Sequence, residues 1–216
     1  MLEINKWGEI TLNHTFLFKI CRIAALFLSF LLATSSPLFS GEIGSLGLKI
    51  GLNITDYYGS DITDNDQSTR TGLLAGGFLT YKVNSLFSIQ PEIFLSMKGG
   101  SRLASYEVES YRLYYLEIPI LAKLTVPTAG PATPNFFVGP AIALKLGSQR
   151  KEVDPSSINN EIKNVDYGFV IGMGIDYEIG YRQFLFELRY HLGTRSIYEN
   201  IDLKNRTVSL IIGYTL

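Results

Sequence analysis

In several apolar segments of this 216-residue chain, charged side chains stand at positions that alternate with aliphatic or aromatic residues. Alternate residues of a β-strand share a face, so these charges would gather on one face while aliphatic residues occupy the other. The residues that alternation assigns to the charged face are Lys49, Glu92, Lys98, Glu117, Lys123, Lys145, Asp176, Glu187, Arg189 and His191. Such a set could form ion pairs, line an ion path or supply a catalytic site.

An ion-pair network that plugs a barrel is the first interpretation of this set. Buried charges must be paired, and side chains fill the interior of a barrel of about eight strands. We expect Glu92 and Glu117, on neighbouring strands, to find partners among Lys123, Lys145 and Arg189. A network of this kind would close the lumen.

A hydrolytic site is the alternative. His191, Glu187 and Ser209 could imitate the base, acid and nucleophile of a hydrolase. Glu187 and His191 would lie about 13 Å apart along one strand at roughly 3.3 Å per residue, too far for a direct hydrogen bond. The sequence has no Gly-x-Ser-x-Gly, zinc-binding or phosphate-loop pattern. We therefore expect no enzyme and no catalytic or cofactor-binding residue.

An acidic segment between two apolar segments raises the question of a metal site. It contains Asp56, Asp61, Asp64 and Asp66, and Asp64-Asn65-Asp66 resembles part of a calcium-binding loop. The glycine and the distal glutamate that such a loop requires are missing at the right spacing. We expect a solvated acidic loop and no metal.

The element that must position Glu92 is a strand of unusual length. From Phe87 to Lys98 apolar and polar residues alternate, and only Phe94 breaks the pattern. This stretch is roughly twice as long as the usual strand of a globular protein. A tilted strand needs about 9 to 11 residues to cross a bilayer, with apolar residues toward lipid and polar residues inward.

The same alternation recurs along the chain without helical periodicity between the segments. The expected strands are residues 46–54, 71–82, 87–98, 111–124, 136–146, 165–177, 184–193 and 206–216. The facing of 71–82 is ambiguous, because Leu73 and Ala75 compete with Leu74 and Phe78. Eight is an even number, as a closed antiparallel barrel requires. The sequence predicts an all-β fold, an eight-stranded antiparallel up-and-down transmembrane β-barrel.

The connections between these segments alternate in length. Long polar connections are expected at 55–70, 99–110, 147–164 and 194–205, and shorter ones at 83–86, 125–135 and 178–183. Outer-membrane barrels have short periplasmic turns and long external loops. A soluble β-sandwich or a secreted lipocalin gives no reason for this alternation.

The N-terminus resembles a secretion signal. An apolar run at 23–33 follows Lys19 and Arg22 and precedes small residues that end at Ser40. We expect residues 1–40 to be a signal peptide that is removed, leaving 41–216 as the barrel domain; an N-terminal membrane anchor is the alternative. Cys21, the one cysteine, lies in the predicted signal, so disulfides cannot stabilise the mature domain.

Composition restricts the partners. The chain is 46% hydrophobic and 18% charged with a formal net charge of −1, so no basic excess points to nucleic acid. We expect a monomer in contact with outer-membrane lipid, located in the bacterial outer membrane.

Four short motifs carry a family resemblance. They are Gln90-Pro91-Glu92, Lys98-Gly99, the run Tyr115-Leu116-Glu117-Ile118-Pro119 with Lys123, and Glu187-x-Arg189-Tyr190. Together they resemble the small outer-membrane β-barrel family related to PorT. The resemblance covers the whole predicted mature chain. It implies an eight-stranded outer-membrane barrel and, through PorT, a partner in the envelope or in a secretion apparatus.

Two classes of function remain open. The first is a structural, envelope-assembly or binding barrel that acts through its external loops, with its lumen closed by ion pairs. The second is a narrow pore or a barrel that binds or transports a small ligand.

Overall fold

The computed structural model describes residues 2–4, 10–12, 42–58, 67–104, 107–151, 164–194 and 204–216. The chain divides into two compact units, Met1–Gly41 and Glu42–Leu216. In the first unit β1 (Leu2–Ile4) pairs antiparallel with β2 (Ile10–Leu12). The apolar run 23–33 lies outside the described residues, and cleavage after Ser40 stays a prediction. Among the described residues no helix is long and apolar enough to cross a membrane.

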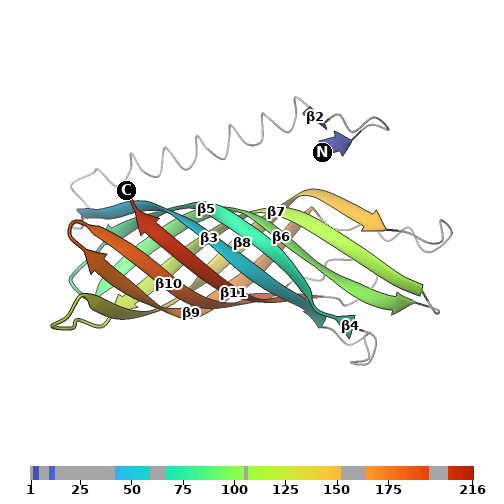
Figure 1. The fold of residues 1–216 in the computed structure, drawn as a ribbon. Helices are drawn as coiled ribbons and strands as arrows, with labels where there is room; N and C mark the ends of the chain where they lie inside the picture. The colour runs from blue at the N-terminus through green and yellow to red at the C-terminus, as the bar shows by residue number, and fades with distance from the viewer. Residues whose placement is uncertain are drawn as a thin grey trace. The chain divides into compact units, whose positions relative to one another are not determined.

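The second unit is built from long antiparallel strands (Figure 1). They are β3 (Glu42–Tyr58), β4 (Gln67–Ser68), β5 (Arg70–Lys82), β6 (Phe87–Ala104), β7 (Glu107–Thr125), β8 (Ala132–Lys151), β9 (Val165–Ile179), β10 (Arg182–Gly193) and β11 (Lys204–Thr215). Each long strand pairs with the next one along the chain, and β11 pairs with β3 from Thr215↔Gly47 to Lys204↔Tyr58. This last pairing closes the sheet, which confirms the predicted eight-stranded antiparallel barrel.

One end of the barrel, here called the short-turn end, is formed by tight connections. The β5–β6 turn spans residues 83–86, and the β9–β10 turn contains Gly180 and Tyr181. Gly180 has a φ of 62°, a left-handed conformation that glycine adopts at little cost. Glu42 pairs with Lys82 and Leu216 donates its N–H to Leu46, so both ends of the barrel's chain lie here as well. The opposite end is called the long-loop end.

Several strands are longer than the sequence predicts. The prediction of a long loop at 99–110 is wrong. β6 continues to Ala104 and β7 begins at Glu107, and these two residues pair. β8 likewise starts at Ala132 and runs to Lys151, well beyond 136–146. Alternation marks only strands with one apolar face, whereas these extensions are rich in polar residues and glycine and carry no sustained alternation. Residues 59–66, 152–163 and 195–203 of the expected long loops lie outside the described residues.

The two faces of the wall follow the predicted alternation. Aliphatic side chains point outward on neighbouring strands, and Leu52, Leu188 and Leu210 lie side by side in one register row, each about half exposed. Inward positions hold the charged residues together with buried Phe78, Phe137 and Leu185. In the ambiguous segment 71–82, Leu74 and Phe78 point inward. Phe94 also points inward, which explains its break in the apolar pattern.

Three adjacent strand pairs of this wall skip register positions at a proline. We call these neighbouring interruptions the proline stripe. The β5–β6 register passes from Phe78↔Glu92 to Tyr81↔Ile89 and skips Pro91. The β6–β7 register skips Pro119, and the β7–β8 register skips Pro140. Proline has no backbone N–H to donate to the ladder. Three adjacent strand pairs therefore lose ladder pairs at neighbouring positions.

Candidate functional site: the charged lumen and its mouth

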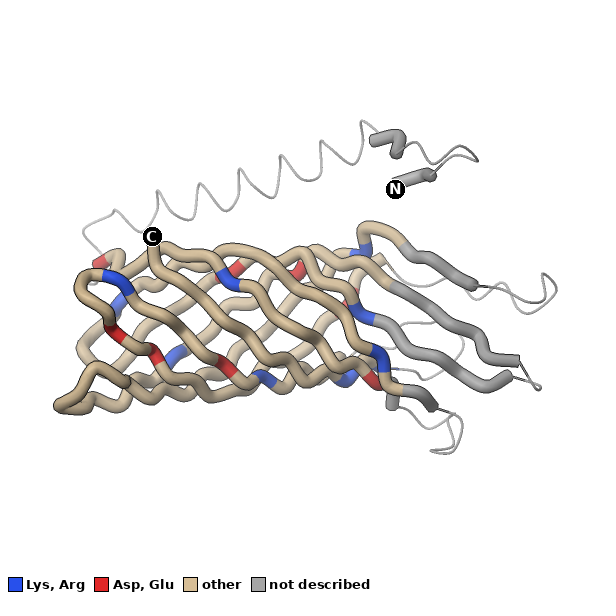
Figure 2. The backbone as a smooth tube through the Cα atoms, viewed as in Figure 1, with Lys and Arg blue, Asp and Glu red and all other residues tan. Residues whose placement is uncertain are grey.

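Acidic and basic residues are spaced along the length of the barrel and are not confined to its ends (Figure 2). The inward-pointing ones form three clusters between the long-loop end and the short-turn end. We call them the outer, central and inner clusters.

The central cluster joins three strands across the lumen. Lys49 Nζ on β3 lies 2.6 Å from Glu92 Oε1 on β6 and 2.6 Å from Glu187 Oε1 on β10. Arg189 donates to both oxygens of Glu92, at 2.5 and 2.8 Å, and its Nε lies 3.0 Å from Glu187 Oε2. Gln90 Nε2 donates a further bond of 2.7 Å to Glu92. Each of the four charges thus has two oppositely charged partners, as burial requires.

Aromatic rings enclose the central cluster. The Lys49 ammonium lies 4.6 Å from the centre of the Phe78 ring. The Arg189 guanidinium lies 5.1 Å from the Phe137 ring and 5.5 Å from the Phe94 ring. Rings at these distances attract the cations and exclude water from the ion pairs. The phenylalanine that broke the sequence pattern at position 94 is therefore part of this site.

The outer cluster lies toward the long-loop end. Lys98 Nζ is 2.9 Å from Glu117 Oε1 and 2.6 Å from His191 Nδ1. Since the ammonium can only donate, Nδ1 accepts, and the ring proton is assigned to Nε2. Between the outer and central clusters lies a void of about 20 Å³, enough for about one water molecule. Lys145 is half-buried beyond this cluster, opposite Tyr115.

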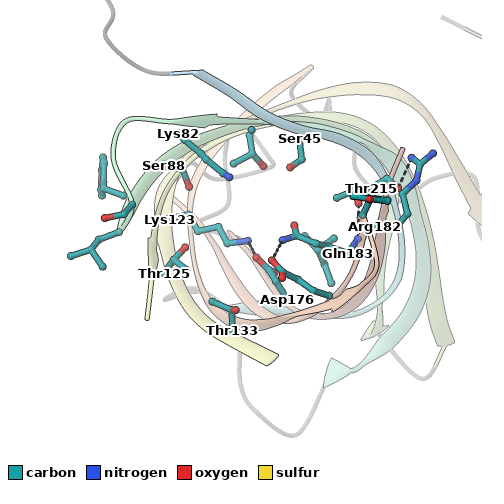
Figure 3. Close-up of a pocket in the computed structure, with 18 of the residues that line it drawn as sticks. Ser45, Lys82, Ser88, Lys123, Thr125, Thr133, Asp176, Arg182, Gln183 and Thr215 are labelled. Atoms are coloured by element: carbon teal, nitrogen blue, oxygen red, sulfur yellow. Dashed lines mark hydrogen bonds and ion pairs between the residues drawn. The ribbon is translucent and has the colours of Figure 1, made fainter. Parts of the chain in front are cut away.

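The inner cluster lies toward the short-turn end. Lys123 Nζ is 2.7 Å from Asp176 Oδ2, and Asn135 Nδ2 donates to Asp176 Oδ1 at 3.0 Å. Beyond it the barrel opens into a polar cavity of about 380 Å³, which we call the mouth. Figure 3 shows Lys82, Lys123 and Asp176 pointing into this cavity, surrounded by serine and threonine side chains.

The structure brings the predicted charges to one face and changes some partners. Arg189 is a partner of Glu92, as expected, and Lys49 is a second one. The expectation that Glu92 or Glu117 pairs with Lys123 is wrong, because Lys123 contacts Asp176 and Glu117 contacts Lys98. Sequence alternation gives the face of a residue, whereas its height in the barrel depends on strand tilt and stagger.

The hydrogen bonds among uncharged polar residues in the lumen were not predicted. Asn53 donates to Ser96 Oγ at 2.8 Å and accepts from Ser209 Oγ at 2.7 Å. Asn205 donates to Asp166 at 3.0 Å. Alternation places Asn53, Ser96 and Ser209 on the inward face, but their bonds depend on how the strands are staggered.

The hydrolase arrangement does not assemble. His191 contacts Lys98, Glu187 contacts Lys49 and Arg189, and Ser209 donates to Asn53. In the described part of the chain no cluster of His, Cys, Asp or Glu could hold a metal ion. Asp56 pairs with Arg206, and Asp61, Asp64 and Asp66 lie outside the described residues.

A family model described as outer membrane protein beta-barrel domain matches residues 44–199. The chain belongs to this family. It is an outer-membrane β-barrel protein, located in the bacterial outer membrane. In barrels of that membrane the short turns face the periplasm, and we expect the same of the short-turn end here.

Two solved structures share the fold. Neisserial surface protein A (NspA) is 11% identical with a TM-score of 0.52, covering 81% of this chain and 98% of that one. The outer membrane protein OprG from Pseudomonas aeruginosa is 10% identical with a TM-score of 0.51, covering 81% and 97%. A search of curated protein sequences gives no match. At such identities the likeness extends to the fold alone.

Proposed function

We propose that this outer-membrane protein is a closed, non-enzymatic barrel that acts through its two ends and does not conduct ions. The observation that carries the proposal is the central cluster. Its side chains span the lumen from β3 to β6 and β10, and those of Lys49 and Glu92 have no exposed surface.

The layers above and below the central cluster support the same proposal. Phe78 and Phe137 pack against the ion pairs, and the Asn53–Ser96–Ser209 bonds join β3, β6 and β11 inside the lumen, toward the long-loop end. Only about 20 Å³ is left between the central and outer clusters. A water-filled path would need a continuous polar channel, whereas eight-stranded barrels are just wide enough for side chains to fill.

Conductance in planar lipid bilayers tests the proposal. We expect no steady current from the wild-type protein. The double substitution Lys49→Ala with Arg189→Ala removes both cations of the central cluster and should admit current or produce noisy openings. Arg206→Ala removes a cation at the long-loop end and should leave the bilayer silent. Steady single-channel current from the wild-type protein would favour the narrow pore instead.

The partners are also proposed. The resemblance of Gln90-Pro91-Glu92 and Leu116-Glu117-Ile118-Pro119 to PorT-related barrels supports a place in an envelope or secretion assembly. The strand extensions at the long-loop end, where β6 and β7 pair as far as Ala104↔Glu107, are the part of the barrel where such a partner would bind. We propose that the barrel itself is a monomer in lipid.

A further inference from the structure

The mouth contains polar groups that the barrel itself leaves unused. Among the described residues, the hydroxyls of Ser45, Ser88, Thr125 and Thr133 have no hydrogen-bond partner, and all four residues line the cavity. They come from β3, β6, β7 and β8, so they converge from several sides (Figure 3). By contrast, the nearby Thr80 and Thr215 hydroxyls are bonded, to Gln90 and to the Gln183 N–H.

Within the described part of the chain, the cations of the mouth also divide into those that have a partner in the barrel and one that has none. Lys123 is bound to Asp176, and Arg182 donates to the Thr215 carbonyl. Lys82 points into the mouth and has no ion pair or hydrogen bond with any described residue. The acids are occupied, since Asp176 binds Lys123 and Asn135 while Glu178 accepts from Gln183. The unused side-chain groups of the described residues in the mouth are thus one ammonium and several hydroxyls.

The backbone provides room for Lys82. A bulge in the β3–β5 pairing between Ile43 and Ser45 makes Gly44 an extra residue. The Lys82 stem runs across this glycine, so that a Cβ at position 44 would lie 2.8 Å from Lys82 Cγ and Cε. The absence of a side chain at Gly44 therefore leaves the space that the Lys82 stem occupies.

We propose that the mouth binds a soluble, hydroxylated oxyanion, such as a sugar phosphate, from the periplasmic side. An oxyanion accepts hydrogen bonds from the Lys82 ammonium and from the wall hydroxyls, and charge-assisted bonds of this kind are the strong ones. The hydroxyls of the ligand exchange bonds with Thr125 and Thr133. A cavity of about 380 Å³ is within the range of small-molecule sites. This binding does not depend on whether the lumen conducts.

Titration calorimetry and amide chemical shifts of the protein folded in zwitterionic micelles test the proposal. The probes are glucose 1-phosphate, inorganic phosphate and glucose. Glucose 1-phosphate should bind best and shift the amides of Ser45, Thr125 and Thr133. Lys82→Gln should weaken its binding about tenfold or more, the loss of one charge-assisted bond. Lys204→Gln, at the long-loop end of β11, should leave binding unchanged.

A second variant separates a positioned ammonium from a general excess of positive charge. Gly44→Ala keeps every charge but displaces the Lys82 stem, so it should also weaken binding of glucose 1-phosphate. Equal binding by wild type, Lys82→Gln and Gly44→Ala would overturn the proposal, as would equal binding of glucose and glucose 1-phosphate. Absence of all binding would overturn it too. Shifts seen only when phosphatidylglycerol is added to the micelles would assign the site to a lipid headgroup and would overturn the soluble ligand.

Discussion

Replacing Arg189 with methionine should lower the free energy of unfolding by about 3 to 5 kcal/mol, the usual cost of removing one partner from a buried ion pair. The substitution leaves Glu92 and Glu187 in the lumen with Lys49 as their one remaining cation. Methionine fills much of the volume between Phe94 and Phe137, so lost packing contributes little. Urea unfolding in lipid vesicles, followed by circular dichroism and by heat-modifiable gel migration, measures the change.

Two comparisons isolate the effect of the buried charge. Arg206→Met removes an arginine whose partner is Asp56 and whose side chain is 44% exposed, so the loss should be no more than about 1 kcal/mol. Adding Glu92→Gln to Arg189→Met removes one uncompensated carboxylate and should recover part of the stability. If Arg189→Met and Arg206→Met cost the same, the central cluster does not stabilise the barrel.

Replacing Leu210 with arginine should cost about 2 to 4 kcal/mol, the value for a cation on the lipid face near the bilayer midplane. Leu210 lies in the middle of β11, 54% exposed, with Leu52 and Leu188 on either side. The same unfolding measurement in vesicles detects the loss, and the fraction of protein that inserts should fall as well.

A second substitution separates the effect of depth in the membrane from the effect of side-chain exposure. Leu216 is 60% exposed but lies at the short-turn end. Leu216→Arg should therefore cost only about 0 to 1 kcal/mol, the value near an interface. Equal losses at positions 210 and 216 would contradict the placement of β11 across the bilayer.

The sequence predicts the faces of the strands well because one physical constraint acts on every second residue. Lipid requires apolar side chains on one side, so Leu210 and Glu187 could be assigned without knowing any neighbour. Phe94 breaks the pattern because its ring covers Arg189, a contact between two strands that the sequence pattern does not show. The extensions of β6 to Ala104 and of β8 to Lys151 were not predicted, since their residues do not alternate between apolar and polar.

The site was predicted less completely than the wall. Alternation gathers Lys49, Glu92, Glu187 and Arg189 on one face, but which acid lies level with which base depends on how far each strand is shifted along its neighbour. That shift includes the bulges in the β3–β5 and β7–β8 pairings, neither of which has a distinct residue pattern. The mouth was not predicted either, because its hydroxyls are ordinary serines and threonines until the turns bring them together.

The proline stripe gives the central cluster a second role. Glu92 belongs to β6 and lies beside Pro91, opposite the skipped Pro119, where the β6 backbone has lost ladder pairs on both sides. Its carboxylate reaches across to Lys49 on β3 and Arg189 on β10, strands whose registers with β11 run without a gap over those positions. Side-chain ion pairs through the interior thus attach the most weakly paired part of the wall to the most continuously paired part. A carboxylate at position 92 therefore contributes to the cohesion of the cylinder itself as well as to the filling of its interior.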